Sequence, residues 1–197
     1  ADGNFHGRTT TIISFSSDSN SKDDFGPHTP GFVSVEYGSS EAIEKAINKN
    51  TAAVLIEPIQ GEGGIIVPTE NYLPEVREIC TKHNVLMIMD EIQSGLGRTG
   101  KMFAFQHSNI QPDGLILGKA LGGGFMPVSC FLSSKEVMQW MNPGSHGSTF
   151  GGNPLAAAIA KRSLELLEEE NLIENSRVMG DFFKESLIDM NSSIIKE

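Results

Sequence analysis

Short apolar runs that each end at a polar residue are the clearest pattern along this chain. Residues 52–56, 85–89 and 114–118 consist of hydrophobic residues and glycine, and the residues on either side of them are polar. Runs this short and this apolar are typical of β-strands that are buried on both faces. Residues 128–132 predict a further strand.

The segments between these runs have helical spacing. Apolar residues recur every three or four positions over 72–83 and 172–190, and 41–47 predicts a shorter helix with Ser40 as its N-cap. Asn153 and Pro154 suit the N-cap and the first turn of a long helix that runs to residue 170. Residues 16–31, rich in Ser, Asp, Gly and Pro, predict a loop. Strands that alternate with helices indicate an α/β fold with a mainly parallel sheet and flanking helices.

Three chemically active residues stand where predicted strands end. Glu57 follows the first strand, Asp90 the second and Lys119 the third. In sheets of this kind ligands collect at the carboxyl ends of the strands, so one shared site is expected. Asp90 ends an apolar run, and a buried carboxylate there requires a compensating cation or protonated ring nitrogen. Lys119 lies among glycines, where desolvation would lower the pKa of its amine and make it nucleophilic.

A plainer interpretation exists for each of these residues. Asp90 and Lys119 can form a structural ion pair, and Lys119 alone can be a solvated lysine at the end of a strand. Ser148 and Thr149 precede the helix at 154, where hydroxyls bind phosphate or act as ordinary caps.

Other motifs are weaker. Residues 95–100 match G-x-G-x-x-G, but 101–105 alternate like a strand or turn instead of opening a helix, which argues against a dinucleotide site. No G-x-S-x-G sequence is present, which argues against an α/β-hydrolase. The histidines and cysteines lack metal-ligand spacing, so no metal site is predicted.

Composition narrows the class of protein. The 197 residues carry a formal charge of −10 without a basic block, which argues against nucleic acid or an anionic membrane as a partner. No apolar run approaches the roughly 20 residues that span a bilayer. Cys80 and Cys130 fall in a predicted helix and strand and are expected to be buried thiols in a reducing compartment. The chain does not begin with Met and ends without a closing element, which suggests a piece of a longer protein.

Five motifs together resemble the class III aminotransferases, which are pyridoxal-phosphate-dependent enzymes of fold type I. The motifs are NFHGRT at 4–9, EPIQGE at 57–62, DEIQ at 90–93, GKAL at 118–121 and HGSTFGGNP at 146–154. The resemblance covers essentially the whole chain. It implies that residues 1–165 are the C-terminal part of the large, cofactor-binding domain and that 166–197 begin the small C-terminal domain.

The resemblance also assigns roles in binding pyridoxal 5′-phosphate. Lys119 matches the Schiff-base lysine, which also transfers the proton, and Asp90 matches the acid that keeps the pyridine nitrogen charged. Gln93 matches the partner of the phenolic oxygen, while Ile92 and Phe5 match residues on the two faces of the ring. Thr149 matches a phosphate ligand that crosses a dimer interface, which implies an obligate homodimer.

Substrate residues follow from the same resemblance. Arg8 matches an arginine that pairs with a substrate carboxylate, and Glu62 matches an acid that selects between the two substrates. His6 and Ser148 are also expected to bind substrate. Glu57 has no clear role in the family motif. It is expected to support the residues that contact the ligand, without contacting the ligand itself.

The implied reaction is transfer of the δ-amino group of ornithine to 2-oxoglutarate, which gives glutamate 5-semialdehyde and glutamate. The segments 25–32 and 126–129 resemble the ornithine enzymes, whereas His6 is common in acetylornithine enzymes, so acetylornithine or another ω-amino acid is the alternative substrate. Family members are longer and contain a phosphate-binding loop, a substrate tyrosine and a substrate arginine that are not found here. A second alternative is therefore a catalytically silent fragment. The expected location is the cytoplasm, or the mitochondrial matrix in a eukaryote.

Overall fold

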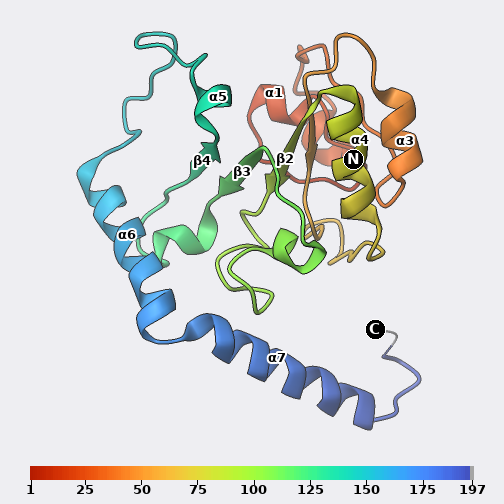
Figure 1. Ribbon diagram of the computed structural model, residues 1–197, viewed down its shortest axis with the longest axis vertical. Helices are drawn as coiled ribbons and strands as arrows, with labels where there is room; N and C mark the ends of the chain where they lie inside the picture. The colour runs from red at the N-terminus through yellow and green to blue at the C-terminus, as the bar shows by residue number, and fades with distance from the viewer. Residues whose placement is uncertain (196–197) are drawn as a thin grey trace.

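The computed structural model describes residues 1–195 and contains a four-stranded mixed sheet (Figure 1). Its strands, in spatial order, are β1 (Ala53–Ile56), β2 (Leu86–Asp90), β3 (Gly114–Leu117) and β4 (Cys130–Ser133). The first three are parallel to one another, and β4 runs antiparallel to β3. The predicted α/β fold with a mainly parallel sheet is confirmed.

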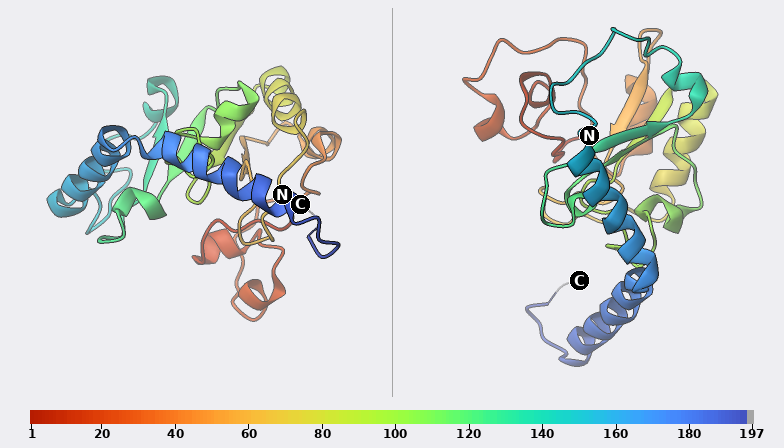
Figure 2. Two further views of the ribbon diagram at one scale, coloured as in Figure 1. Left: turned by 90° about the horizontal axis from the view of Figure 1, so that it is seen from below. Right: turned by 90° about the vertical axis from the view of Figure 1, so that its left-hand side faces the viewer.

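Helices lie around this sheet and continue beyond it. Helix α4 packs against β2 and α3, while residues 1–35 lie across the opposite face of the sheet (Figure 2). The core between α4 and the sheet contains Val76, Cys80, Met87 and Met89, none of which is exposed. The helices are α1 (Thr10–Ile13), α2 (Ser19–Lys22), α3 (Ser40–Ala46), α4 (Tyr72–His83), η1 (Ala104–Ser108), η2 (Lys119–Gly122), α5 (Lys135–Met138), α6 (Pro154–Glu169) and α7 (Leu172–Asp189).

Most predicted elements agree with the structure to within two residues, and the exceptions have local causes. The side chain of Ser39, rather than Ser40, accepts the hydrogen bond from the amide of Ala42, so Ser39 is the N-cap of α3. Asp18 caps the short helix α2 inside the predicted loop at 16–31 by accepting from the amide of Asn20. Cys130 is only partly buried, because β4 is an edge strand.

Helices α6 and α7 leave the body of the molecule at one end (Figures 1 and 2). The first turn and a half of α7 still contact the 95–100 loop, where the hydroxyl of Ser176 donates to the carbonyl of Arg98. Farther along, Phe182 and Phe183 are more than half exposed. The predicted domain boundary at 165/166 falls inside α6, and the division into 1–165 and 166–197 stays a prediction. Residues 196–197 lie outside the described part of the chain.

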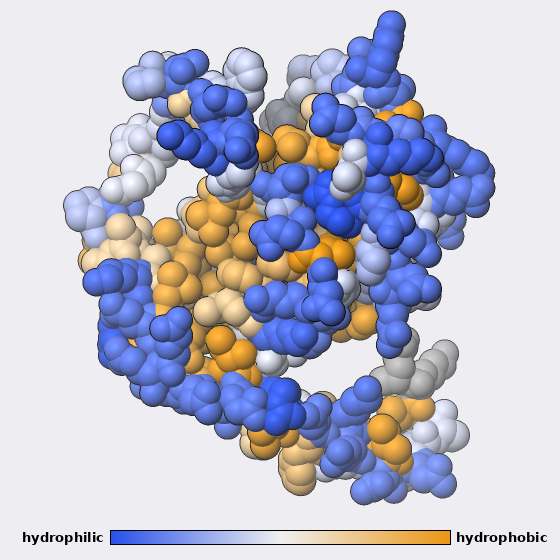
Figure 3. All heavy atoms as spheres, viewed as in Figure 1, coloured by the Kyte–Doolittle hydropathy of each residue, from blue (hydrophilic) through white to orange (hydrophobic). Residues whose placement is uncertain are grey.

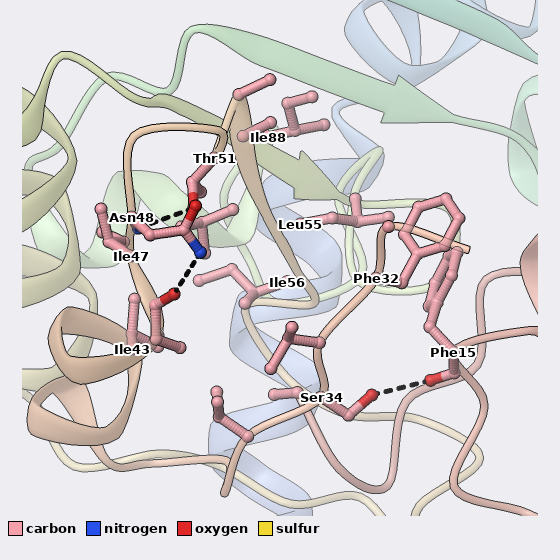
Figure 4. Close-up of a pocket in the computed structure, with 18 of the residues that line it drawn as sticks. Phe15, Phe32, Ser34, Ile43, Ile47, Asn48, Thr51, Leu55, Ile56 and Ile88 are labelled. Atoms are coloured by element: carbon pink, nitrogen blue, oxygen red, sulfur yellow. Dashed lines mark hydrogen bonds between the residues drawn. The ribbon is translucent and has the colours of Figure 1, made fainter.

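Both edges of the sheet carry apolar surface that is open to solvent. Strand β1 pairs only with β2, and its outer side borders a groove lined by Phe15, Phe32, Ile43, Ile47 and Leu55 (Figure 4). Figure 3 shows a second hydrophobic area between α6 and the sheet, and on β4 the side chains of Phe131 and Leu132 are nearly half exposed. Among the described residues, no helix combines the length and the hydrophobicity that crossing a membrane requires.

Candidate active site

The three strand ends that the sequence singled out lie on one edge of the sheet. Glu57 directly follows β1, Asp90 is the last residue of β2, and Lys119 follows β3 after a single glycine. Because β1, β2 and β3 are parallel, their carboxyl ends face the same side. We refer to Glu57, Asp90, Gln93 and Lys119 as the strand-end cluster.

Asp90 is a buried carboxylate with a partner on each oxygen. Its Oδ2 lies 2.7 Å from Nδ1 of His6, and its Oδ1 accepts from the amide of Ile92 at 3.0 Å. The side chains of His6 and Asp90 are 3 % and 4 % exposed. An ionised carboxylate only accepts hydrogen bonds, so Nδ1 of His6 carries the hydrogen. His6 is therefore a direct partner of Asp90, and its predicted contact with a substrate stays a prediction.

Lys119 and Gln93 contact each other through their side chains. The Nζ of Lys119 donates to Oε1 of Gln93, and the lysine side chain remains exposed. The backbone of Lys119 has a φ of 42°, a conformation that costs a non-glycine residue about 1–3 kcal/mol. Strain of this kind is concentrated at functional sites, and here it directs the amine toward Gln93.

Glycines allow the loops to approach one another closely at this site. A Cβ on Gly61 would lie 2.5 Å from Cδ of Gln93, and one on Gly118 would lie 3.3 Å from Cγ1 of Ile92. The Gln93 side chain therefore rests directly on the backbone of Gly61. In the same way, the glycine at 118 leaves room for the side chain of Ile92.

Phe5 and Arg8 form one wall beside the cluster. The amide of Phe5 donates to Oε1 of Glu57 at 2.9 Å, and the Arg8 guanidinium carbon lies 5.8 Å from the centre of the Phe5 ring. Arg8 and Glu62 are both exposed, so their charged groups are available to a ligand. This arrangement brings Phe5 and Arg8 to the site, while Glu62 is on the loop that follows Gly61.

The remaining predicted residues are not assembled with the others. Ser148 and Thr149 are exposed in the segment 139–153, which arches away from the sheet between α5 and α6 (Figure 1). The Oγ of Ser148 accepts from the amide of Gly151 at 3.0 Å. Within residues 1–195, Thr149 makes no hydrogen bond to any other candidate residue.

Two supporting residues could not be identified from the sequence. The hydroxyl of Tyr37 lies 3.0 Å from the carbonyl oxygen of Glu57 and 3.1 Å from that of Pro58, and burial raises the pKa of this phenol. Glu91 accepts from the amides of Ala104 and Phe105 and from the hydroxyl of Ser94, and burial raises its pKa. Tyr37 is in a stretch without a motif, and Glu91 carries no signal that distinguishes a support from an active acid.

The residues present fit a planar heterocycle with an aldehyde. Asp90 can face a ring nitrogen, Gln93 can donate to a ring oxygen, and Lys119 supplies a primary amine next to it. The aromatic ring of Phe5 provides a flat surface, and the glycine at 61 lets the Gln93 side chain lie close to the backbone. Over residues 1–195, no three His, Cys, Asp or Glu side chains come together as a metal site.

A carboxylate and a lysine at adjacent carboxyl ends of a parallel sheet place the molecule among the pyridoxal-phosphate-dependent transferases. The chain belongs to the class III aminotransferases, because the model of that family matches residues 1–197.

Several relatives of this chain are ornithine aminotransferases. The chain is 53 % identical to an ornithine aminotransferase of Oceanobacillus iheyensis over all of its length and 50 % of that protein. The structure matches an ornithine aminotransferase of Toxoplasma gondii with a TM-score of 0.92 and 45 % identity, over 94 % of this chain and 44 % of that one. That enzyme is described with partial occupancy of pyridoxal phosphate in its active site. An acetylornithine aminotransferase of Elizabethkingia anophelis matches with a TM-score of 0.77 and 49 % identity, over 82 % of this chain and 44 % of that one. The chain thus spans about half the length of the relatives that it matches.

Proposed function

We propose that this chain supplies the catalytic lysine and acid of an ornithine δ-aminotransferase. The reaction moves the δ-amino group of ornithine to 2-oxoglutarate and gives glutamate 5-semialdehyde and glutamate. The observation that carries the proposal is Asp90, buried and held by His6, on the same edge of the sheet as Lys119 and Gln93. The names of the matched relatives support ornithine as the substrate.

When bound, pyridoxal 5′-phosphate supplies an electron sink for the carbon that carries the substrate amine. Asp90 would face the ring nitrogen and stabilise its protonated form, and His6 holds the Asp90 carboxylate in place. Lys119 would hold the cofactor through its Nζ and would move the proton at the reacting carbon. Gln93 would donate to the phenolic oxygen, and Phe5 and Ile92 would lie on the two faces of the ring.

The substrate is bound by charged groups at the open side of the site. Arg8 pairs with a substrate carboxylate through two parallel hydrogen bonds, and its position over Phe5 brings this pair next to the ring. Glu62 selects between the amino donor and the oxo acid, and Ser148 contributes a further polar contact. Acetylornithine is the alternative donor, favoured by the Elizabethkingia anophelis structure at 49 % identity.

Assembly completes the site in this proposal. Two copies form a dimer in which Thr149 of one binds the phosphate held by the other, and its exposure in the extended 139–153 segment supports that role. Residues 1–165 act as part of the cofactor domain, and 166–197 begin the small domain. The cytoplasm, or the mitochondrial matrix in a eukaryote, is the proposed location.

A second candidate is a chain that is silent on its own. The observation that favours it is the half-length match to the relatives, together with the open outer edge of β1. Such a chain would become active only with the polypeptide that provides the rest of the fold.

Turnover separates these proposals. The purified chain is saturated with pyridoxal phosphate and given 2-oxoglutarate with ornithine or acetylornithine, and glutamate and the semialdehyde are measured with and without a polypeptide covering the rest of the family fold. Conversion of ornithine in preference to acetylornithine in either mixture supports the ornithine assignment. Activity only in the complemented mixture identifies a silent half. No conversion in either mixture contradicts the proposed function.

A further inference from the structure

Glu57 has a role that its place in the family motif does not explain. It is only 7 % exposed, and each of its carboxylate oxygens accepts a hydrogen bond from a different loop. Oε1 accepts from the amide of Phe5 at 2.9 Å, and Oε2 accepts from the amide of Gly61 at 3.1 Å. We propose that Glu57 is a positioning residue that holds the Phe5 wall and the Gly61 loop at a fixed separation across the cofactor site.

Both loops contact the residues that act on the cofactor in the function proposed above, on which this inference rests. On one side, Phe5 provides the aromatic wall. On the other, Gln93 lies against the backbone of Gly61, where even a Cβ would overlap it, and Gln93 accepts from Lys119 Nζ. A shift of either loop therefore changes the space between Phe5 and Lys119.

The rest of the environment of Glu57 fixes its own position. Tyr37 contacts the carbonyl oxygens of Glu57 and Pro58 through its hydroxyl, immediately after β1. No ion pair of Glu57 is found in residues 1–195, and both of its carboxylate oxygens are held by backbone donors. A buried carboxylate held this way is costly for stability alone, because its desolvation must be offset by the bonds that it makes.

Only a carboxylate of this length can accept from both amides at once. In Glu57→Gln one oxygen becomes an NH₂ group, which faces a backbone N–H as donor against donor. In Glu57→Asp the side chain is shorter by one methylene and cannot span both loops. Both variants should free at least one loop.

The test compares these variants with Asp113→Asn in the full chain. Asp113 precedes β3, and its Oδ2 accepts from the amide of Met87 and from Nη1 of Arg77, each at 2.7 Å. Asp113→Asn therefore removes a carboxylate charge at the opposite end of the sheet, while its one oxygen can still accept from both donors. Two quantities are measured by NMR. The first is the hydrogen-exchange rate of the backbone amides of Phe5 and Gly61, and the second is the chemical shift of the Gln93 side-chain amide. The third is the rate at which borohydride fixes pyridoxal phosphate to Lys119, relative to the exposed Lys161.

For Glu57→Gln we expect about tenfold faster exchange at Phe5 or Gly61, the effect of one lost hydrogen bond to a charged group. The Gln93 amide signal should move, and the Lys119:Lys161 ratio should fall about tenfold. Asp113→Asn should leave all three unchanged. Unchanged exchange and an unmoved Gln93 signal in Glu57→Gln would overturn the proposal, as would an equal response in Asp113→Asn.

Failure of the proposed function has a different signature. If the wild-type chain fixes no more cofactor at Lys119 than at Lys161, the aminotransferase assignment fails. The amide exchange and the Gln93 signal then still decide whether Glu57 positions the two loops.

Discussion

The strand-end cluster and the 139–153 segment carry equally specific motifs but differ in how the chain holds them. In the cluster, Asp90 has a partner on each oxygen and Glu57 joins two loops. In the segment, Thr149 is exposed and has no contact with the cluster, and Trp140 is 78 % exposed. The first region is built by contacts within this chain. In the proposed dimer, the second would be completed by contacts with the other copy.

This difference follows from sheet geometry. Parallel strands bring their carboxyl ends together whatever loops follow them, so Asp90 and Lys119 lie at the same edge once the sheet forms. A long loop has no such template and orders only when it gains enough contacts to offset its entropy. Changes in the two regions should therefore have different effects, and four predictions separate them.

The largest effect is expected from removing the charge of Asp90. Asp90→Asn keeps the size of the side chain but cannot hold a proton on a ring nitrogen, so the rate of the ornithine half-reaction should fall about 10²–10³-fold. Stopped-flow absorbance of the cofactor measures it in the form of the protein that turns over. A decrease of less than threefold would mean that Asp90 is only a structural partner of His6.

Thr149→Ala should weaken cofactor binding only when the chain forms a dimer. Loss of one hydrogen bond to a charged phosphate should weaken pyridoxal phosphate binding about tenfold or more where the dimer is populated. It should leave the free energy of unfolding of the separate chain unchanged, because the side chain is exposed. Cofactor titrations at two protein concentrations, one favouring the monomer and one the dimer, check this. Equal weakening of cofactor binding in the monomer would mean that Thr149 contacts the cofactor of its own chain.

Tyr37→Phe should destabilise the cluster, whereas Ser148→Ala in the 139–153 segment should not. The tyrosine change leaves the buried carbonyls of Glu57 and Pro58 without a donor and should lower the free energy of unfolding by about 1–3 kcal/mol. Ser148→Ala removes one exposed contact and should stay within about 0.5 kcal/mol. Urea unfolding followed by circular dichroism tests both, and similar values would remove the distinction between the regions.

The smallest effect is a loss of stability in alkali that is confined to the core. Burial raises the pKa of the Cys80 thiol to about 11 from 9.0 and also raises that of Tyr37. Because the folded state favours the protonated thiol, the contribution of Cys80 is fully present below about pH 9 and is lost as the pH rises through 11. The contribution of Tyr37 begins to be lost only above about pH 10. Circular dichroism should detect this, and Cys80→Ala should reduce it. The fluorescence of Trp140, in the 139–153 segment, should change little over the same pH range. A change in this signal as large as that in circular dichroism would contradict the difference between the two regions.

The elements that could be predicted from the sequence are those that the spacing of hydrophobic and polar residues determines. Short apolar runs identified β1, β2 and β3, and their polar ends identified Glu57, Asp90 and Lys119. The cap of α6 was also predictable, since Asn153 followed by Pro154 is a strong local signal, and the side chain of Asn153 accepts from the amide of Ala156.

Contacts between distant loops were not predictable from these patterns. The contact between His6 and Asp90 joins residues that are far apart in the sequence, and His6 was assigned to the substrate because only its motif was visible. Tyr37 was missed because its partners are backbone carbonyls, which leave no pattern in the sequence. Ser40 was taken as the cap of α3 because Ser39 and Ser40 are equivalent by residue type, and only backbone geometry separates them.

The most direct test of the central claim is the position at which the chain captures its cofactor. The chain is incubated with pyridoxal phosphate, reduced with borohydride, digested, and mapped by mass spectrometry. The account predicts that Lys119 carries most of the label, and that Lys119→Arg removes it without increasing the label elsewhere. A label spread over exposed lysines such as Lys161, with Lys119 no more modified than they are, would contradict it.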